Sequence, residues 1–165
     1  MFGLLKPKVT AKELGSQLLE WARDENDVDR QLLAGLPEDI DRTRVKSELR
    51  YLRAFAIEFA ATQSTSNPEV RKAARDGFYA MLRLEVELSG AFSLETLDSR
   101  YVAYSKASQQ NHHLGLPYCI GKEFATSCGA PDNIGLVLPA AHYFGVSCAM
   151  IAQRLKDVRL ERRDK

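Results

Sequence analysis

Residues 134–158 read IGLVLPAAHYFGVSCAMIAQRLKDV, and this stretch decides the fold. Its first 19 residues carry no formal charge, whereas five basic residues follow between positions 154 and 163. Apolar or small side chains recur at steps of three and four residues through both parts, at Ala141, Phe144, Cys148, Ile151, Leu155 and Val158. This stripe of apolar positions continues beyond Arg154 into the part that contains the charged residues. A stripe of this kind predicts a helix packed in a bundle.

The same stretch raises the alternative of a membrane span, because a spanning helix needs about 20 apolar residues. Pro139 opposes a span, since the residue before a proline is disfavoured in the helical conformation. A helix that begins near Pro139 leaves only 14 uncharged residues before Arg154. The polar groups of His142 and Tyr143 are also costly in lipid. We therefore expect a buried bundle helix and regard membrane contact as unlikely.

The wider segment around this helix is also poor in charge. Residues 100–153 contain five charged side chains, and the rest of the chain holds the other 40. Charged residues are seldom buried, so a long segment without them is expected to be shielded from water by the fold, a partner or a ligand. All three His and all three Cys lie in this segment. We expect the functional residues there.

Capping signals predict further helices upstream. Thr10 and Glu13 form a capping-box pattern that starts a first helix. A short helix follows over residues 28–36, and a long, charged third helix comes after it. Asn67 followed by Pro68 is a strong signal for the start of a fourth helix. The short connection between the third and fourth helices favours an antiparallel hairpin.

Downstream, Ser93 caps a fifth helix, and Pro117 opens a sixth that ends near Gly129. No strand pattern competes with these helices. The sequence therefore predicts an all-α fold: a single-domain helical bundle of six to seven helices, with mostly antiparallel neighbours.

The length of 165 residues fits one domain, and 45% hydrophobic and 27% charged residues are close to globular averages. We assign residues 10–160 to the bundle, residues 1–9 to a flexible N-terminal tail and residues 161–165 to a basic C-terminal tail. The apolar start of the chain is too short for a signal peptide. With an odd number of cysteines and no CxxC spacing, free thiols in the cytoplasm are the simplest expectation.

A net charge of +1 makes a nucleic-acid binder unlikely, because such proteins are usually strongly basic. The charges are unevenly placed, however, with acids concentrated in residues 13–41 and bases in residues 42–53. Four bases recur at steps of three and four residues and so share a helix face: Arg42, Lys46, Arg50 and Arg53. We interpret them as a surface balanced by the neighbouring acids, with a polyanion-binding face as the alternative.

Metal or haem binding is the main chemical alternative. His112 and His113 closely precede Cys119, and a His/Cys cluster could hold Zn²⁺ if its members converge. His142 could be an axial haem ligand, although a histidine on an apolar helix face is more often a core residue with hydrogen-bonded ring nitrogens. No zinc-ligand spacing and no haem attachment motif is present, so we expect no cofactor.

The sequence contains no motif typical of an enzyme. HExxH, Walker A, GxGxxG and GxSxG patterns are absent, and no His has a Glu three residues before it, as a di-iron bundle requires. Glu58 lies between apolar stripe positions of the third helix, and we interpret it as solvated. Catalysis is therefore not indicated.

Four tyrosines fall in the charge-poor segment: Tyr101, Tyr104, Tyr118 and Tyr143. Tyrosine is enriched at protein interfaces, where charged residues are depleted. We therefore expect a protein-interaction or assembly module, most simply a homo-oligomer. It buries this Tyr-rich face, while the charged first, third and fourth helices face water.

The alternative is a small-molecule, haem or metal-binding bundle with a site in the same segment. Its candidate residues are His112, His113, Tyr118, Cys119 and His142.

Overall fold

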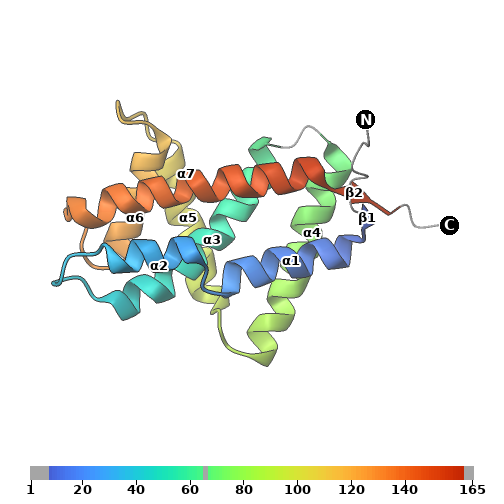
Figure 1. Ribbon diagram of the computed structural model, residues 1–165, viewed down its shortest axis with the longest axis horizontal. Coiled ribbons are helices and arrows are strands. Elements are labelled where there is room, and N and C mark those ends of the chain that lie inside the picture. The colour runs from blue at the N-terminus through green and yellow to red at the C-terminus, as the bar shows by residue number, and fades with distance from the viewer. Residues whose placement is uncertain (1–7, 65–66, 162–165) are drawn as a thin grey trace.

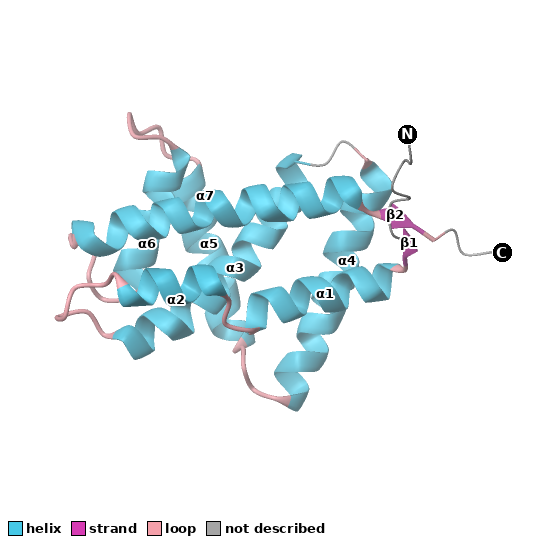
Figure 2. Cartoon of the chain, in the orientation of Figure 1, coloured by secondary structure: helices cyan, strands magenta, loops and turns pink. Residues whose placement is uncertain are grey.

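The computed structural model describes residues 8–64 and 67–161, which form a bundle of seven helices (Figures 1 and 2). The helices are α1 (Ala11–Arg23), α2 (Asp27–Ala34), α3 (Arg42–Ser64), α4 (Pro68–Leu88), α5 (Leu94–Ser108), α6 (Leu116–Ser127) and α7 (Ile134–Asp157). The prediction of an all-α bundle is confirmed. Most helix boundaries lie within about two residues of those predicted.

The predicted caps are present. In the capping box of α1, the Glu13 amide donates to Thr10 Oγ1 at 3.1 Å, and the Thr10 amide donates to the Glu13 carboxylate at 2.7 Å. Asn67 accepts from the first amides of α4. A second capping box at the start of α2, formed by Asn26 and Asp29, was not predicted. These local hydrogen bonds fix where the helices begin.

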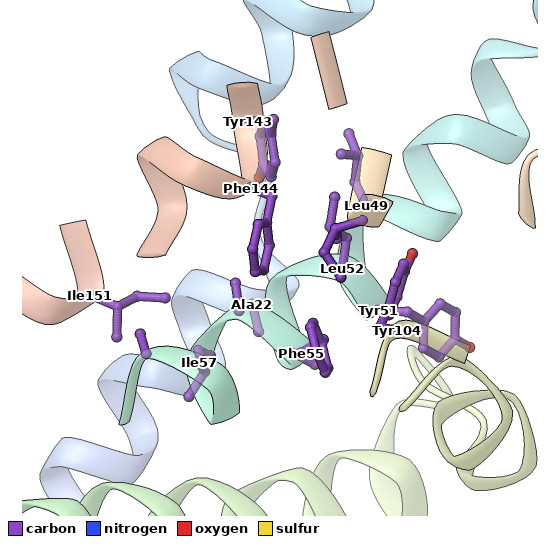
Figure 3. Close-up of a cluster of buried hydrophobic side chains, with 14 of the residues drawn as sticks. Ala22, Leu49, Tyr51, Leu52, Phe55, Ile57, Tyr104, Tyr143, Phe144 and Ile151 are labelled. Carbon is purple, nitrogen blue, oxygen red and sulfur yellow. The ribbon is translucent and has the colours of Figure 1, made fainter. Parts of the chain in front are cut away.

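α3 is the central helix of the bundle. Every residue from position 51 to position 57 is buried, and α3 contacts all six other helices. Phe55 packs against Tyr104 of α5 and Phe144 of α7, with ring centroids 5.1 Å and 6.0 Å apart (Figure 3). The prediction that the third helix faces water is therefore wrong for its middle part: the first turns of α3 are exposed, whereas residues 51–57, Arg53 included, are enclosed.

α4 packs chiefly against α1 and touches α3 little, so the predicted hairpin of the third and fourth helices is wrong (Figure 1). The contact depends on two glycines. A Cβ on Gly15 would lie 2.3 Å from the carbonyl carbon of Gly77, and a Cβ on Gly77 would lie 2.3 Å from the Ala11 carbonyl oxygen. The backbones of α1 and α4 cross directly at this point because neither position has a side chain.

α7 begins at Ile134, so Pro139 lies inside the helix and not at its start. The conformational penalty before a proline is outweighed here by packing. Val137 and Ala141 are buried against α6, where a Cβ on Gly121 would lie 2.4 Å from the Val137 carbonyl oxygen. The first turns of α7 are therefore held by close contact with α6.

The two ends of the described chain meet in a small parallel sheet. β1 (Lys8–Val9) pairs with β2 (Arg159–Leu160), and the Glu161 amide donates to the Val9 carbonyl at 3.0 Å. Lys8, Val9 and Glu161, which we predicted to lie in the terminal tails, therefore belong to the folded domain. The remainder of the predicted tails, at residues 1–7 and 162–165, lies outside the described residues.

Replacing Gly77 with Ala should force α1 and α4 apart, at a cost of about 1–3 kcal/mol in the free energy of unfolding. Urea denaturation measures this loss. Gly145 is a matched control in α7, because a Cβ there meets nothing within 4 Å. Gly145→Ala should stabilise the helix by up to about 1 kcal/mol. Equal stability of the wild type and Gly77→Ala would contradict the close crossing.

Candidate functional site

Arg53 lies at the centre of a buried polar cluster. Its side chain forms an ion pair with Asp29, and its Nε donates to the Ala22 carbonyl at 2.9 Å. Its Nη2 donates to the Arg23 carbonyl at 3.4 Å. The guanidinium thus satisfies carbonyls at the end of α1 and the carboxylate in the first turn of α2. Arg53 is only 2% exposed, so the prediction that it belongs to a polyanion-binding face is wrong.

Tyr143 completes this cluster from α7. Its hydroxyl donates to the second oxygen of the Asp29 carboxylate at 2.5 Å. Burial raises the pKa of Tyr143 well above its usual value, and the nearby carboxylate of Asp29 raises it further. Tyr143 is therefore a buried structural residue that joins α7 to α2. It is not on the outer surface, where a ligand or interface residue was expected.

Removing the charge of Asp29 should be strongly destabilising, because it leaves the Arg53 guanidinium buried without a counter-charge. We expect Asp29→Asn to lower the free energy of unfolding by about 3–5 kcal/mol. Asp27 in the same helix is the control, since it is exposed and pairs with exposed Arg30. Asp27→Asn should change stability by less than about 0.5 kcal/mol. Similar losses for the two variants in a denaturant titration would contradict the role of the cluster.

A charged cleft of about 760 Å³ opens beside this cluster, between the connections that follow α1 and α4. Its bases are Arg23, Lys46, Arg50 and Arg53, and its acids are Asp24, Glu25, Asp29 and Glu85. Lys46 pairs with Glu25 at 2.5 Å, and Arg23 pairs with Asp24 and Glu85. Equal numbers of opposite charges leave no excess positive potential for a polyanion.

The remaining members of the predicted basic face are also engaged. Arg42 donates to the Leu36 carbonyl at 3.3 Å, and Arg50 donates to the Ala91 carbonyl at 3.5 Å. These bonds direct the guanidinium groups toward loop carbonyls. The four bases of α3 therefore connect neighbouring segments, which the sequence alone could not reveal.

Two other tyrosines of the charge-poor segment also lie in the core. The Tyr101 hydroxyl donates to the Ala54 carbonyl at 2.8 Å, and Tyr104 is fully buried against Phe55. Burial raises the pKa of both phenols well above the usual value. Tyr101 and Tyr143 are thus held in the interior by hydrogen bonds and Tyr104 by burial. Tyr118 of α6 is the one of the four tyrosines to which neither applies.

Glu58 is not a freely solvated residue, contrary to our interpretation of the sequence. Its carboxylate forms an ion pair with Arg75 of α4 at 2.8 Å, and its side chain is 19% exposed. Tyr79 is a neighbour, and burial raises the pKa of Tyr79 to about 12. Arg75 lies 17 residues after Glu58 in sequence. The rules for side-chain pairs concern residues three or four positions apart on one helix, so they do not apply to this pair. This group joins α3 to α4 at their limited contact.

His112, His113 and Tyr118 come together as a stack of three rings. The His112 ring lies 4.3 Å from that of His113 and 4.7 Å from that of Tyr118, and its Nδ1 accepts from the Leu114 amide at 3.1 Å. Cys119 points inward and is buried. No three His, Cys, Asp or Glu side chains in residues 8–64 and 67–161 are grouped as a metal ion requires. The zinc alternative thus has no ligand set there.

α7 has an exposed, uncharged outer side. We call six of its residues, which are exposed or half-buried and carry no charged group, the α7 face: Ile134, Leu138, His142, Val146, Ala149 and Met150. Ile134, Leu138 and Met150 are 56%, 52% and 50% exposed, which is high for large apolar side chains. His142 is exposed, so the interpretation of this residue as part of the core is wrong. The fold alone does not shield this helix from water.

Grooves flank the α7 face. One of about 570 Å³ lies toward α6, where Leu114, Pro117 and Tyr118 face Leu138 and His142. A second, of about 300 Å³, lies toward α2 and also has His142 in its wall. A third, apolar groove of about 230 Å³ lies between α1 and Met150. The exposed side of α7 is therefore a ridge between hollows.

Among the described helices, α7 is also the one long and apolar enough to cross a membrane by length and composition. Only 39% of its most apolar 18-residue window is buried in the fold. The exposed residues of the α7 face are among those that the fold leaves uncovered. No family model, curated protein or solved structure matches this chain, so its function is argued from its own geometry.

The thiols of Cys128 and Cys148 should be unreactive in the folded protein. Burial raises the pKa of each to about 12, so at pH 8 both remain protonated, whereas the thiolate is the nucleophile. In a Cys119→Ala background, we expect no prompt reaction with a disulfide reagent at pH 8. Unfolding in guanidinium is the control and should release both thiols. Rapid labelling of either native thiol would contradict the burial described here.

Proposed function

We propose that the protein is an assembly module that associates with a second copy of itself through the α7 face. The observation that carries this proposal is the exposure of large apolar side chains along a helix without a charged residue between positions 134 and 153. Exposed apolar surface of this kind marks interaction sites in folded proteins. Association would remove it from water.

The shape of the surface favours a second copy as the occupant. In an interface with twofold symmetry, the same patch lies on both partners and must fit itself. Helices pack by inserting the ridge of one into the groove of another. The α7 face supplies a ridge, and the hollows beside His142 supply grooves. Each copy can therefore insert its ridge beside that of the other.

The dimensions can be compared with those of known interfaces. The α7 face spans residues 134–150, which is about 24 Å along the helix axis. Together with the neighbouring sides of α2 and α6, at helix spacings of about 10 Å, it forms a strip of about 500 Å². A stable interface of standard size buries about 800 Å² on each partner. The strip would supply more than half of this area.

A lipid surface fits the α7 face less well than a second copy does. Helices that lie in the membrane interface carry abundant Lys and Arg beside their apolar side. α7 has none before Arg154, and the grooves beside it are concave, so a flat lipid surface would leave them unfilled. Haem or small-molecule binding in the same region stays a prediction, as does a cytoplasmic location.

Leu138→Asp tests this proposal, because it would place an unpaired charge within the interface. We expect the wild type to dimerise in sedimentation equilibrium, and this variant to weaken the dimer at least 100-fold, as about 3 kcal/mol for an uncompensated charge requires. Leu88→Asp is the matched control, since Leu88 is an apolar residue of α4 that is 83% exposed. The control should dimerise as the wild type does.

Two outcomes would overturn the proposal. One is a wild-type protein that stays monomeric up to millimolar concentration. The other is a monomer that floats with vesicles of mixed zwitterionic and anionic lipid and loses this binding in Leu138→Asp, which would assign the α7 face to membranes.

A further inference from the structure

His142 lies at the midpoint of the α7 face. Ile134 is eight residues before it and Met150 is eight residues after it, and both are about half exposed. The imidazole also lines both of the larger grooves, the one toward α6 and the one toward α2. It is the one ionisable residue of the α7 face. Any partner that covers this face must cover His142.

In the self-association proposed above, symmetry determines what His142 meets. If the two copies of α7 run antiparallel about a twofold axis at the middle of the face, Ile134 lies opposite Met150 and Leu138 lies opposite Val146. Apolar residues then pair along the whole face. His142 is left opposite His142 of the second copy, so two imidazoles share the centre of the interface.

The walls of the two grooves offer no counter-charge to a positive charge on His142. The titratable side chains that share the two grooves with it are Tyr118 and Tyr143, and no carboxylate lines either groove. Asp29 of α2 lies behind Tyr143 and is paired with Arg53. On the α6 side, His112 stacks on Tyr118 and His113 stacks on His112, and the charged residues of α6 itself are one base and one acid, Lys122 and Glu123.

We propose that protonation of His142 controls association, with the neutral imidazole permitting the dimer and the imidazolium preventing it. Covering an ionised group with apolar surface and no counter-charge disfavours its charged form. Two imidazolium groups facing each other would add repulsion. This inference rests on self-association through the α7 face and adds its regulation.

The direction of the pH dependence follows from linkage. His142 binds its proton less tightly in the dimer than in the monomer, so the dimer is stable at high pH and is lost as pH falls. With one imidazole on each copy, the dissociation constant should rise at least about tenfold between pH 7.5 and pH 5.5.

The experiment is sedimentation equilibrium of the full chain at pH 7.5 and pH 5.5, with wild type, His142→Gln and His113→Gln. Glutamine keeps a polar side chain of similar size without a titrating group. We expect the wild type and His113→Gln to show a weakening of at least about tenfold at pH 5.5. His142→Gln should dimerise at both pH values, with a change below about threefold. Circular dichroism at pH 5.5 checks that each variant remains folded.

The outcomes separate this inference from the proposed function. A wild-type dimer with the same dissociation constant at both pH values would overturn control by His142 and leave self-association intact. A His142→Gln dimer that weakens as the wild type does would also overturn it, by assigning the effect to another group. Monomers of all three proteins at both pH values would overturn self-association itself, and this inference with it.

Discussion

The buried guanidinium of Arg53 is the contact on which the arrangement of the bundle depends. No other side chain could take its place, because it donates hydrogen bonds to two carbonyls at the end of α1 and forms an ion pair with Asp29 of α2 at the same time. Asp29 in turn receives the hydroxyl of Tyr143 from α7. Four helices therefore meet at one charged group. A buried charge is tolerable only when it is paired and hydrogen-bonded, and here both conditions hold.

This cluster also places the α7 face. Because Tyr143 is directed inward to Asp29, the preceding residue, His142, is directed outward into the space between α2 and α6. The buried side of α7 continues through Phe144 and Ile151, and the opposite side remains uncharged and uncovered. One helix thus has an inner side that stabilises the fold and an outer side that we propose is covered by a second copy. The inner side lacks charged residues because it packs in the core, and we attribute their absence from the outer side to the proposed association.

The sequence predicted what depends on local chemistry. Thr10 with Glu13, and Asn67 with Pro68, marked helix starts correctly because caps involve residues only a few positions apart. It could not predict the crossing of α1 and α4, since neither Gly15 nor Gly77 shows in sequence which backbone it approaches. The depletion of charge singled out the segment that contains the α7 face. It could not distinguish Tyr104, which is in the core, from His142, which faces outward.

The most direct test of the account is the distance between two copies of one surface position. A spin label at Gln153→Cys lies on an exposed part of α7, 11 residues beyond His142, while the native thiols are buried or half-buried. In an antiparallel pair centred on His142, the two labels are separated by 22 helical residues, which is about 35 Å. Double electron–electron resonance at pH 7.5 should show one narrow distance distribution near this value. A signal without dipolar modulation would contradict self-association, and a distance below about 20 Å would contradict the antiparallel pairing centred on His142.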